Sequence, residues 1–114
     1  MSVDPREIAD GTLVVRTSEN GGATVVSLCG ELDLANAGTA ETVLRDCFDG
    51  GERPVIVDMS ELEFIDSTGI ALLVATLGRN DEGATVSFVP SSAPAVTRVL
   101  ELTGLAERLP LAEA

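Results

Sequence analysis

Short runs of apolar, β-branched residues alternate along the chain with longer segments in which apolar residues recur every three or four positions. The short runs are residues 13–17, 24–29, 55–57 and 85–89. We expect each to be a strand, and Asn20-Gly21 between the first two predicts a hairpin turn. Strands alternating with helices require crossovers between parallel strands. The pattern predicts an α/β domain with a mixed sheet of four to five strands that begins with a hairpin.

Three longer segments have helical periodicity. The first follows Asn36, which we expect to cap it, the second follows Asp66, and the third begins at Ser92 with Pro94 in its first turn and ends at Gly104. We expect Leu105 to fold back on the third helix and a short edge strand to form near Leu109. The apolar stripes are Ala40, Val43, Leu44 and Cys47; Ile70, Leu73, Val74 and Leu77; and Val96, Val99, Leu100 and Thr103.

The 114 residues fit one domain. Residues 1–11 are polar and without period, so we expect a loosely ordered lead-in that leaves room for a short strand from Glu7. The domain should span residues 12–110, and residues 111–114 should be a tail. We expect three to four helices in all. A fourth helix, after Leu105, would be no longer than one turn.

Charge narrows the class of partner. The net charge is −12, with 19 acidic residues against seven arginines and no lysine. This argues against nucleic acid and against direct contact with an anionic membrane, and it would steer a basic protein surface toward the chain. Cys29 and Cys47 lie on different predicted elements, and no secretory start precedes them. We therefore expect a cytoplasmic protein whose cysteines are small buried apolar residues.

The helix after Asp66 has an unusual outer face. Away from its expected core stripe lie Thr68, Ala71, Leu72, Ala75 and Arg79, so no residue before Arg79 is charged. A solvated helix face normally carries charge. Another element of the domain therefore covers this face, or the face is offered to a partner. Burial of Leu72 would indicate the first alternative and its exposure the second.

Ser67 opens the same helix, where backbone N–H groups are unpaired and a phosphate would be favoured. From the residues alone, a helix-start role is the simpler interpretation. A hydrolytic nucleophile is excluded, because the sequence has neither histidine nor lysine to act as base and lacks a G-x-S-x-G turn. We expect no catalytic residue and thus no enzyme.

Three carboxylates, Asp33, Asp58 and Asp66, follow predicted strands and could converge into a magnesium or phosphoryl-accepting pocket, as in response-regulator receivers. Receivers also use an adjacent acidic pair after the first strand and a lysine, and this sequence has neither. We therefore expect no metal and no cofactor. A P-loop is also missing from the sequence, so any ATP used would belong to a partner.

Three blocks identify a family resemblance that spans residues 13–105. They are Gly30-Glu31-Leu32-Asp33, Phe64-Ile65-Asp66-Ser67-Thr68-Gly69-Ile70 after Val57-Asp58, and the segment from Val96 to Leu105. In this order they resemble STAS domains, specifically the bacterial anti-sigma factor antagonists. The resemblance implies a STAS-like fold in which Ser67 is phosphorylated by a partner anti-sigma factor kinase, with Thr68 as a second possible acceptor. The unphosphorylated form would bind the anti-sigma factor and release a sigma factor, and a serine phosphatase would reset the switch.

The resemblance also places the loop of Asp33, and with less weight Glu31, near the serine. The predicted partner surface consists of Glu31, Asp33, Asp66, Thr68, Gly69, Ala71, Leu72 and Ala75. The alternative is a non-catalytic STAS subunit or adaptor of a transport or stress-signalling complex. Such relatives often have a degraded Asp-Ser motif, so the intact Asp66-Ser67 favours the antagonist.

Overall fold

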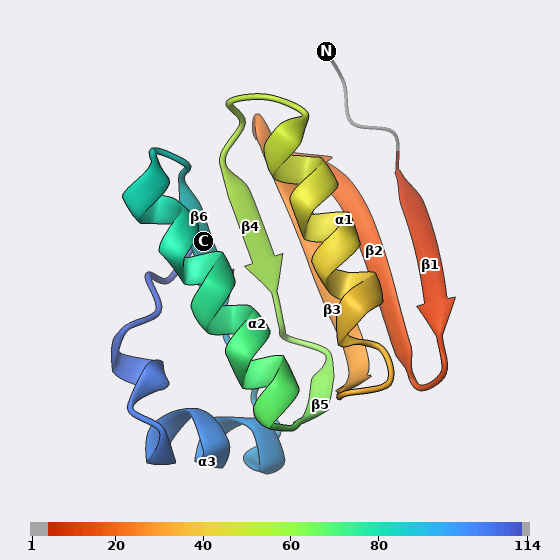
Figure 1. The fold of residues 1–114 in the computed structure, drawn as a ribbon, viewed down its shortest axis with the longest axis vertical. Coiled ribbons are helices and arrows are strands. Elements are labelled where there is room, and N and C mark those ends of the chain that lie inside the picture. The colour runs from red at the N-terminus through yellow and green to blue at the C-terminus, as the bar shows by residue number, and fades with distance from the viewer. Residues whose placement is uncertain (1–4, 113–114) are drawn as a thin grey trace.

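The predicted alternation of strands and helices folds into a mixed sheet with helices on one face (Figure 1). The computed structural model describes residues 5–112. Its strands are β1 (Arg6–Asp10), β2 (Leu13–Asn20), β3 (Ala23–Leu32), β4 (Val55–Asp58), β5 (Leu62–Ile65) and β6 (Val86–Val89). Its helices are α1 (Ala37–Asp49), α2 (Ser67–Leu77) and α3 (Pro94–Leu102), with the short 3₁₀-helices η1 (Gly78–Glu82) and η2 (Leu105–Glu107).

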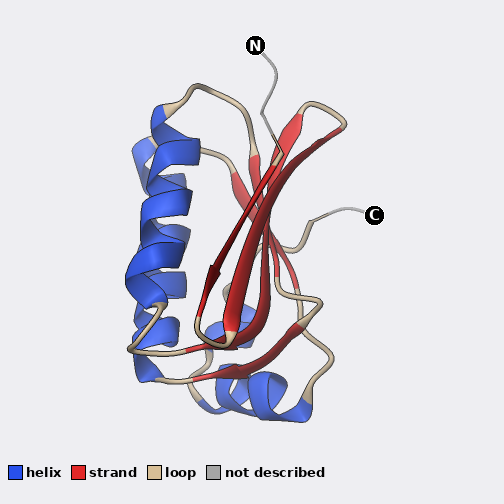
Figure 2. Ribbon diagram, turned by 90° about the vertical axis from the view of Figure 1, so that its right-hand side faces the viewer, coloured by secondary structure: helices blue, strands red, loops and turns tan. Residues whose placement is uncertain are grey.

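Strand β3 is the centre of the sheet, whose order is β1-β2-β3-β4-β6. The first three strands are antiparallel, while β4 is parallel to β3 and β6 is parallel to β4. β4 pairs with β3 up to Ser27–Asp58. From Gly30–Leu62 onward β3 pairs with β5 instead, also in parallel. Figure 2 shows α1 and α2 together on one face of the sheet, with α3 at its lower end. The predicted fold class, with its initial hairpin, is confirmed.

The sheet has six strands, more than the four to five predicted, because β5 was not expected and β1 was expected only as a possible short strand from Glu7. Residues 6–10, expected in the loose lead-in, form the edge strand β1, in which Ile8 packs against the core and Asp10 accepts a hydrogen bond from Thr39 Oγ1 at 2.7 Å. Strand β5, expected to be loop, buries its first and last residues, Leu62 and Ile65. Neither strand alternates over enough residues to show a period of two.

The C-terminal segment behaves largely as expected. Gly104 has the left-handed φ of 76°, and Leu105 is buried. Only η2 follows, so there is no more than a turn of a fourth helix within the described residues. The expected edge strand lies slightly later than Leu109, where Leu111 bridges Phe88. Part of the predicted tail therefore extends the sheet beyond β6, while residues 113–114 lie outside the described residues, as do residues 1–4 at the other end.

Helix α2 is rotated from the expected orientation. Its buried residues are Gly69, Leu72, Leu73 and Thr76, whereas Val74, placed in the predicted stripe, is 42% exposed. The buried stripe is thus shifted by one residue toward the N-terminus. Because nearly every residue of α2 is apolar, periodicity could not choose between the two faces. The contact with α1 decides which face of α2 is buried, because α1 covers one flank of α2.

Gly30 allows β3 to change partners from β4 to β5. It has φ +96° at an irregularity in the register, and a Cβ built on it would lie 2.1 Å from the carbonyl oxygen of Thr12. A side chain there meets both an unfavourable backbone conformation and a backbone atom that cannot move aside. Glycine is required at this position for β3 to continue.

We therefore predict that Gly30→Ala lowers the free energy of unfolding by about 3 kcal/mol, through positive φ and steric overlap. Gly38→Ala is the matched control, because a Cβ at this helical glycine meets nothing within 4 Å. It should be neutral or stabilise by up to about 1 kcal/mol. Urea denaturation of both variants measures the difference, and equal stabilities would contradict the assignment.

Candidate functional site

The parallel pairing of β3 and β5 brings two segments of the predicted site together. β3 ends at Leu32 and β5 at Ile65, and these residues are register partners. The segment after β3 and the segment that enters α2 therefore begin side by side, at the carboxyl ends of these two parallel strands (Figure 1). The predicted proximity of the Asp33 loop and Ser67 follows from this pairing.

Asp66 joins the two segments. As the N-cap of α2, it accepts a hydrogen bond from Gly69 N–H on Oδ1 at 3.0 Å, which confirms the predicted cap. Its other oxygen, Oδ2, accepts from Leu34 N–H at 3.1 Å. A carboxylate accepts such bonds on both oxygens, and charged acceptors form stronger bonds than neutral ones. One side chain therefore fixes both the start of α2 and the loop beside it.

The loop after β3 is held from within by Asn36. Its Oδ1 accepts from Asp33 N–H at 2.9 Å and its Nδ2 donates to Glu31 O at 2.9 Å. Asn36 occupies the N-cap position of α1, yet its buried side chain makes no capping bond, so that part of the prediction is wrong. Asp33 Oδ1 accepts from Ala35 N–H at 3.0 Å and tightens the turn. These hydrogen bonds hold the loop in one conformation.

Ser67 is the first residue of α2 and is exposed. Thr68 is half-buried, and Ala71 and Ala75 are exposed one and two turns further along the helix. Asp66 satisfies the amide of Gly69, while those of Ser67 and Thr68 belong to the first turn, which has no intrahelical partner. A hydroxyl-bearing residue therefore stands at the positive end of the helix, with an uncharged face continuing from it.

Two residues of the predicted partner surface are buried and not exposed. Leu72 is only 7% exposed and, with Leu44 of α1, lines the space between the two helices, and Gly69 is also buried. A Cβ on Gly69 would lie 2.6 Å from Ile65 Cγ1 and 3.0 Å from Leu32 Cγ, so glycine lets α2 approach the sheet closely. The prediction that Leu72 and Gly69 are exposed members of the partner surface is therefore wrong. Burial of Leu72 indicates the first alternative, in which another element of the domain, here α1, covers this flank of α2. The exposed, uncharged face of α2 comprises Ser67, Ala71, Val74 and Ala75.

Sequence reasoning missed Leu34, which is 78% exposed. Its backbone N–H donates to Asp66, so Leu34 lies in the loop after β3 next to the start of α2, with its side chain exposed. Glu31 is exposed and Asp33 half-buried in the same segment. A leucine inside a polar turn was the available signal, because nothing in the local pattern gives it a core position. Large exposed apolar residues of this kind mark interaction surfaces.

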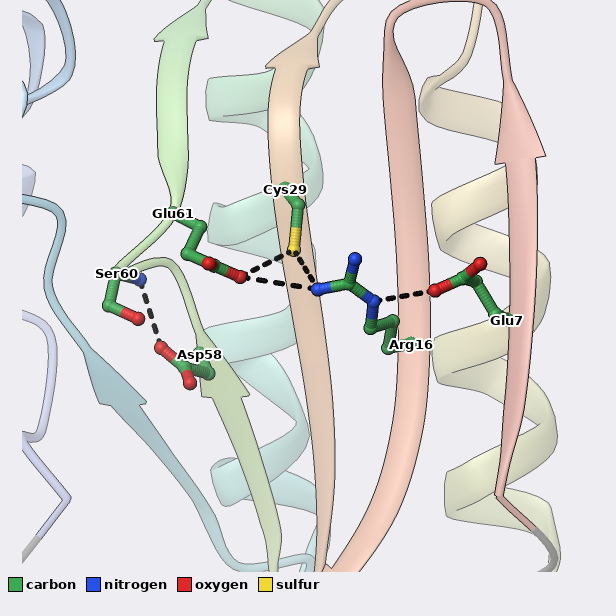
Figure 3. Close-up of polar contacts among 6 residues, drawn as sticks. All are labelled: Glu7, Arg16, Cys29, Asp58, Ser60 and Glu61. Carbon is green, nitrogen blue, oxygen red and sulfur yellow. Dashed lines mark hydrogen bonds and ion pairs between the residues drawn. The ribbon is translucent and has the colours of Figure 1, made fainter.

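Asp58 does not join Asp33 and Asp66. Its side chain accepts a hydrogen bond from Ser60 N–H at 2.9 Å. Asp58 is the register partner of Ser27, which pairs in turn with Arg16, so the Asp58 side chain lies on the sheet face away from α1 and α2 (Figure 3). The alternative pocket of three carboxylates is therefore not formed. Among residues 5–112, no group of histidine, cysteine, aspartate and glutamate side chains is arranged to hold a metal ion.

Arg16 is the centre of a polar cluster on that opposite face (Figure 3). Its Nε donates to Glu7 Oε1 at 2.6 Å, which raises the pKa of Arg16, and its Nη1 lies 3.3 Å from Glu61 Oε2. Burial, followed by the hydrogen bond to Glu61, raises the pKa of Cys29 to about 11. Burial also raises the pKa of Cys47. Both thiols therefore stay protonated at neutral pH and are poor nucleophiles, in keeping with a structural role.

Comparisons with known proteins identify the family and the fold. The family model of the STAS domain matches residues 14–114. The anti-sigma-F factor antagonist RsfB of Mycobacterium tuberculosis is 30% identical over 98 residues, covering 85% of this chain and 79% of RsfB. An anti-sigma-B factor antagonist of Staphylococcus aureus is 30% identical over 80 residues, covering 70% of this chain and 74% of the relative.

Among solved structures, an anti-sigma factor antagonist from Mycobacterium paratuberculosis superposes with a TM-score of 0.75 at 25% identity, covering 100% of this chain and 92% of that one. Within residues 5–112, none of the helices has the length and apolar character needed to cross a bilayer.

We predict that Asp66→Ala lowers the free energy of unfolding by about 2 kcal/mol, because it removes a helix cap and a second charged hydrogen bond. Asp66→Asn keeps one acceptor oxygen and should lose about half as much. Hydrogen exchange should accelerate at the amides of Leu34 and Gly69. Asp81→Ala, at an exposed position of η1, is the control. Unchanged exchange at Leu34 would show that the carboxylate does not hold the loop.

Proposed function

Since the chain belongs to the STAS domain family, we propose that it is an anti-sigma factor antagonist controlled by phosphorylation of Ser67. In the unmodified state it binds an anti-sigma factor that is also a serine kinase, and a sigma factor is released. Phosphorylation of Ser67 ends the binding, and a serine phosphatase restores it. The relatives named as antagonists of anti-sigma factors support this class of partner.

The observation that carries the proposal is the position of Ser67. It is exposed, it begins α2, and its neighbour Asp66 anchors both sides of the surface around it. A partner kinase can reach the hydroxyl without local unfolding. The surrounding surface is fixed in place before binding, so little conformational entropy is lost on association.

The proposed contact surface combines apolar and acidic residues on these two segments. Thr68, Ala71 and Ala75 continue from Ser67 along α2, and Leu34 projects from the adjacent loop. Glu31, Asp33 and Asp66 give this end of the domain negative charge. With a net charge of −12, the chain would be steered toward a basic surface on the anti-sigma factor.

A phosphate on Ser67 would act within the contact and not on the fold. It carries about −1.5 to −2 charges, and the helix start tolerates such a group. In the complex, however, the phosphate must be desolvated beside the Asp66 carboxylate and against an apolar partner surface. Burying an uncompensated charge costs several kcal/mol. Binding is therefore lost while the domain stays folded.

The chain's own part in this cycle is that of phosphoryl acceptor. It contains no histidine or lysine to serve as a base. The kinase and its ATP belong to the partner, and the reaction transfers the γ-phosphoryl group to Ser67 Oγ while ADP leaves and the hydroxyl proton is released.

We predict that Ser67→Ala binds the anti-sigma factor kinase with the affinity of the unmodified wild type, and that ATP does not weaken this binding. Ser67→Glu should bind at least about tenfold more weakly, because a charge must be buried. Isothermal titration calorimetry with and without ATP measures both effects. Mass spectrometry of the wild type after incubation with kinase and ATP should locate one phosphate on Ser67.

Thr68→Ala is the control for the second possible acceptor, and it should still be phosphorylated and released. Thermal melting should place Ser67→Glu within about 1 kcal/mol of the wild type. Equal affinities of wild type, Ser67→Ala and Ser67→Glu for the kinase would refute the switch.

We also predict that Leu34→Ser weakens kinase binding by about tenfold or more, because an exposed leucine at the centre of a contact is lost. The free energy of unfolding should change by less than about 0.5 kcal/mol, since the side chain is 78% exposed. Leu102→Ser, at the similarly exposed end of α3 (77%), is the matched control and should bind normally. Equal binding by both variants would remove Leu34 from the contact.

A further inference from the structure

A groove of about 280 Å³ runs between α1 and α2, on the outer surface of the helical layer. Both helices lie side by side on the sheet and point in the same direction (Figure 1). The buried side chains of Leu44 and Leu72 contribute to the groove lining, and the exposed residues Ala71 and Ala75 form part of the α2 wall. The groove begins at Thr68, immediately beside Ser67, and continues to the other end of α2.

Two of the chain's seven arginines line this groove. Arg79 lies just beyond α2, with its guanidinium carbon 5.0 Å from the centre of the Phe48 ring at the end of α1. Arg45 is on α1 and pairs with Glu41 one turn before it. Arg79 is only loosely paired, since the nearest oxygen of Glu82 is 3.9 Å away. The lining therefore has two positive charges and one negative on a chain whose net charge is −12.

The groove is consequently polarised along its length. The end near Ser67 lies next to Asp66, the N-cap of α2, whereas Arg45 and Arg79 line the part of the groove farther from Ser67. An apolar floor with opposite charges at its two ends favours a ligand of matching polarity. Stacking on Phe48 holds Arg79 in place, so its charge is presented in a fixed position.

We propose that this groove is the docking site for an amphipathic helix of the partner that carries carboxylates at one end. Its apolar side chains would fill the space between the α1 and α2 walls, and its carboxylates would pair with Arg79 and Arg45. This inference rests on the proposed function and deepens it, because it extends the contact from the Ser67 end of α2 onto α1. It also sets the orientation in which the partner binds.

The proposed ligand is a helix because the groove walls are themselves helical, with lining residues on α2 from Thr68 and on α1 from Ala37 to Phe48. α2 has 11 residues, or about three turns, so a partner helix of similar length would present side chains at i, i+4 and i+7 along it. Two neighbouring helices offer ridges and a groove into which a third helix packs. The charge pattern then specifies direction, since the reversed helix would place its carboxylates near Asp66 at the start of α2.

Charge reversal at the far end tests the proposal. Arg79→Glu and Arg45→Glu should each weaken binding of the anti-sigma factor kinase by about tenfold or more, while Arg79→Lys should lose less than about threefold. Arg108→Glu changes the net charge equally at an exposed position outside the groove lining and should bind like the wild type. Thermal melting checks that each variant is folded. Reversing one carboxylate of the partner helix to lysine should restore binding to Arg79→Glu.

The outcomes separate this inference from the proposed function. If Ser67→Glu abolishes binding but Arg79→Glu and Arg45→Glu bind like the wild type, the groove is not used and the Ser67 switch survives. If the wild type neither binds nor is phosphorylated by the kinase, the proposed function itself fails. Sedimentation of the chain alone gives a further test, because a dimer that Arg79→Glu dissociates would assign the groove to a second copy and overturn the proposal.

Discussion

The parallel pairing between the end of β3 and the four-residue strand β5 determines where the candidate site forms. Because Leu32 and Ile65 are register partners, the segments that follow them leave the sheet at neighbouring points. Asp66 then bonds across the short gap to Leu34 N–H while capping α2. Without this pairing, the Asp33 loop and Ser67 would be 34 residues apart with no reason to meet. Gly30 makes the pairing possible, because it lets β3 pass the irregularity where β4 gives way to β5.

A fixed surface around Ser67 suits the proposed switch, which would act through added charge alone. The loop after β3 is secured by Asn36 and Asp66, and α2 is held close to the sheet through Gly69. A phosphate on Ser67 would therefore find no local structure to melt, and its effect would be confined to the surface a partner must cover. Regulation of this kind needs no conformational change in the domain, since the added charge alters the free energy of the complex directly.

Helix α2 contributes one face to the core and leaves the opposite face for the proposed partner. Leu72, Leu73 and Thr76 are buried, while Ser67, Ala71, Val74 and Ala75 remain exposed. Small side chains on the exposed flank leave the groove beside α1 open. The opposite face of the sheet is different in character, because Arg16 links Glu7 and Glu61 across neighbouring strands and the nearby Cys29 thiol remains protonated. The residues of the proposed switch and docking site are thus concentrated on the helical side.

The sequence by itself determined the α/β class, the initial hairpin, the cap at Asp66 and the place of Ser67 at a helix start. Each of these depends on neighbouring residues, through strand composition, turn chemistry or capping. Tertiary structure decided the short strand β5, and it turned the possible strand from Glu7 into β1, because their few residues show no period but gain hydrogen bonds from a neighbouring strand. It also decided which face of α2 is buried, because a helix apolar on nearly every side takes its orientation from what packs against it. Burial of Leu72 beside α1, exposure of Leu34 and separation of Asp58 from Asp66 all follow from such long-range packing, which no local pattern encodes.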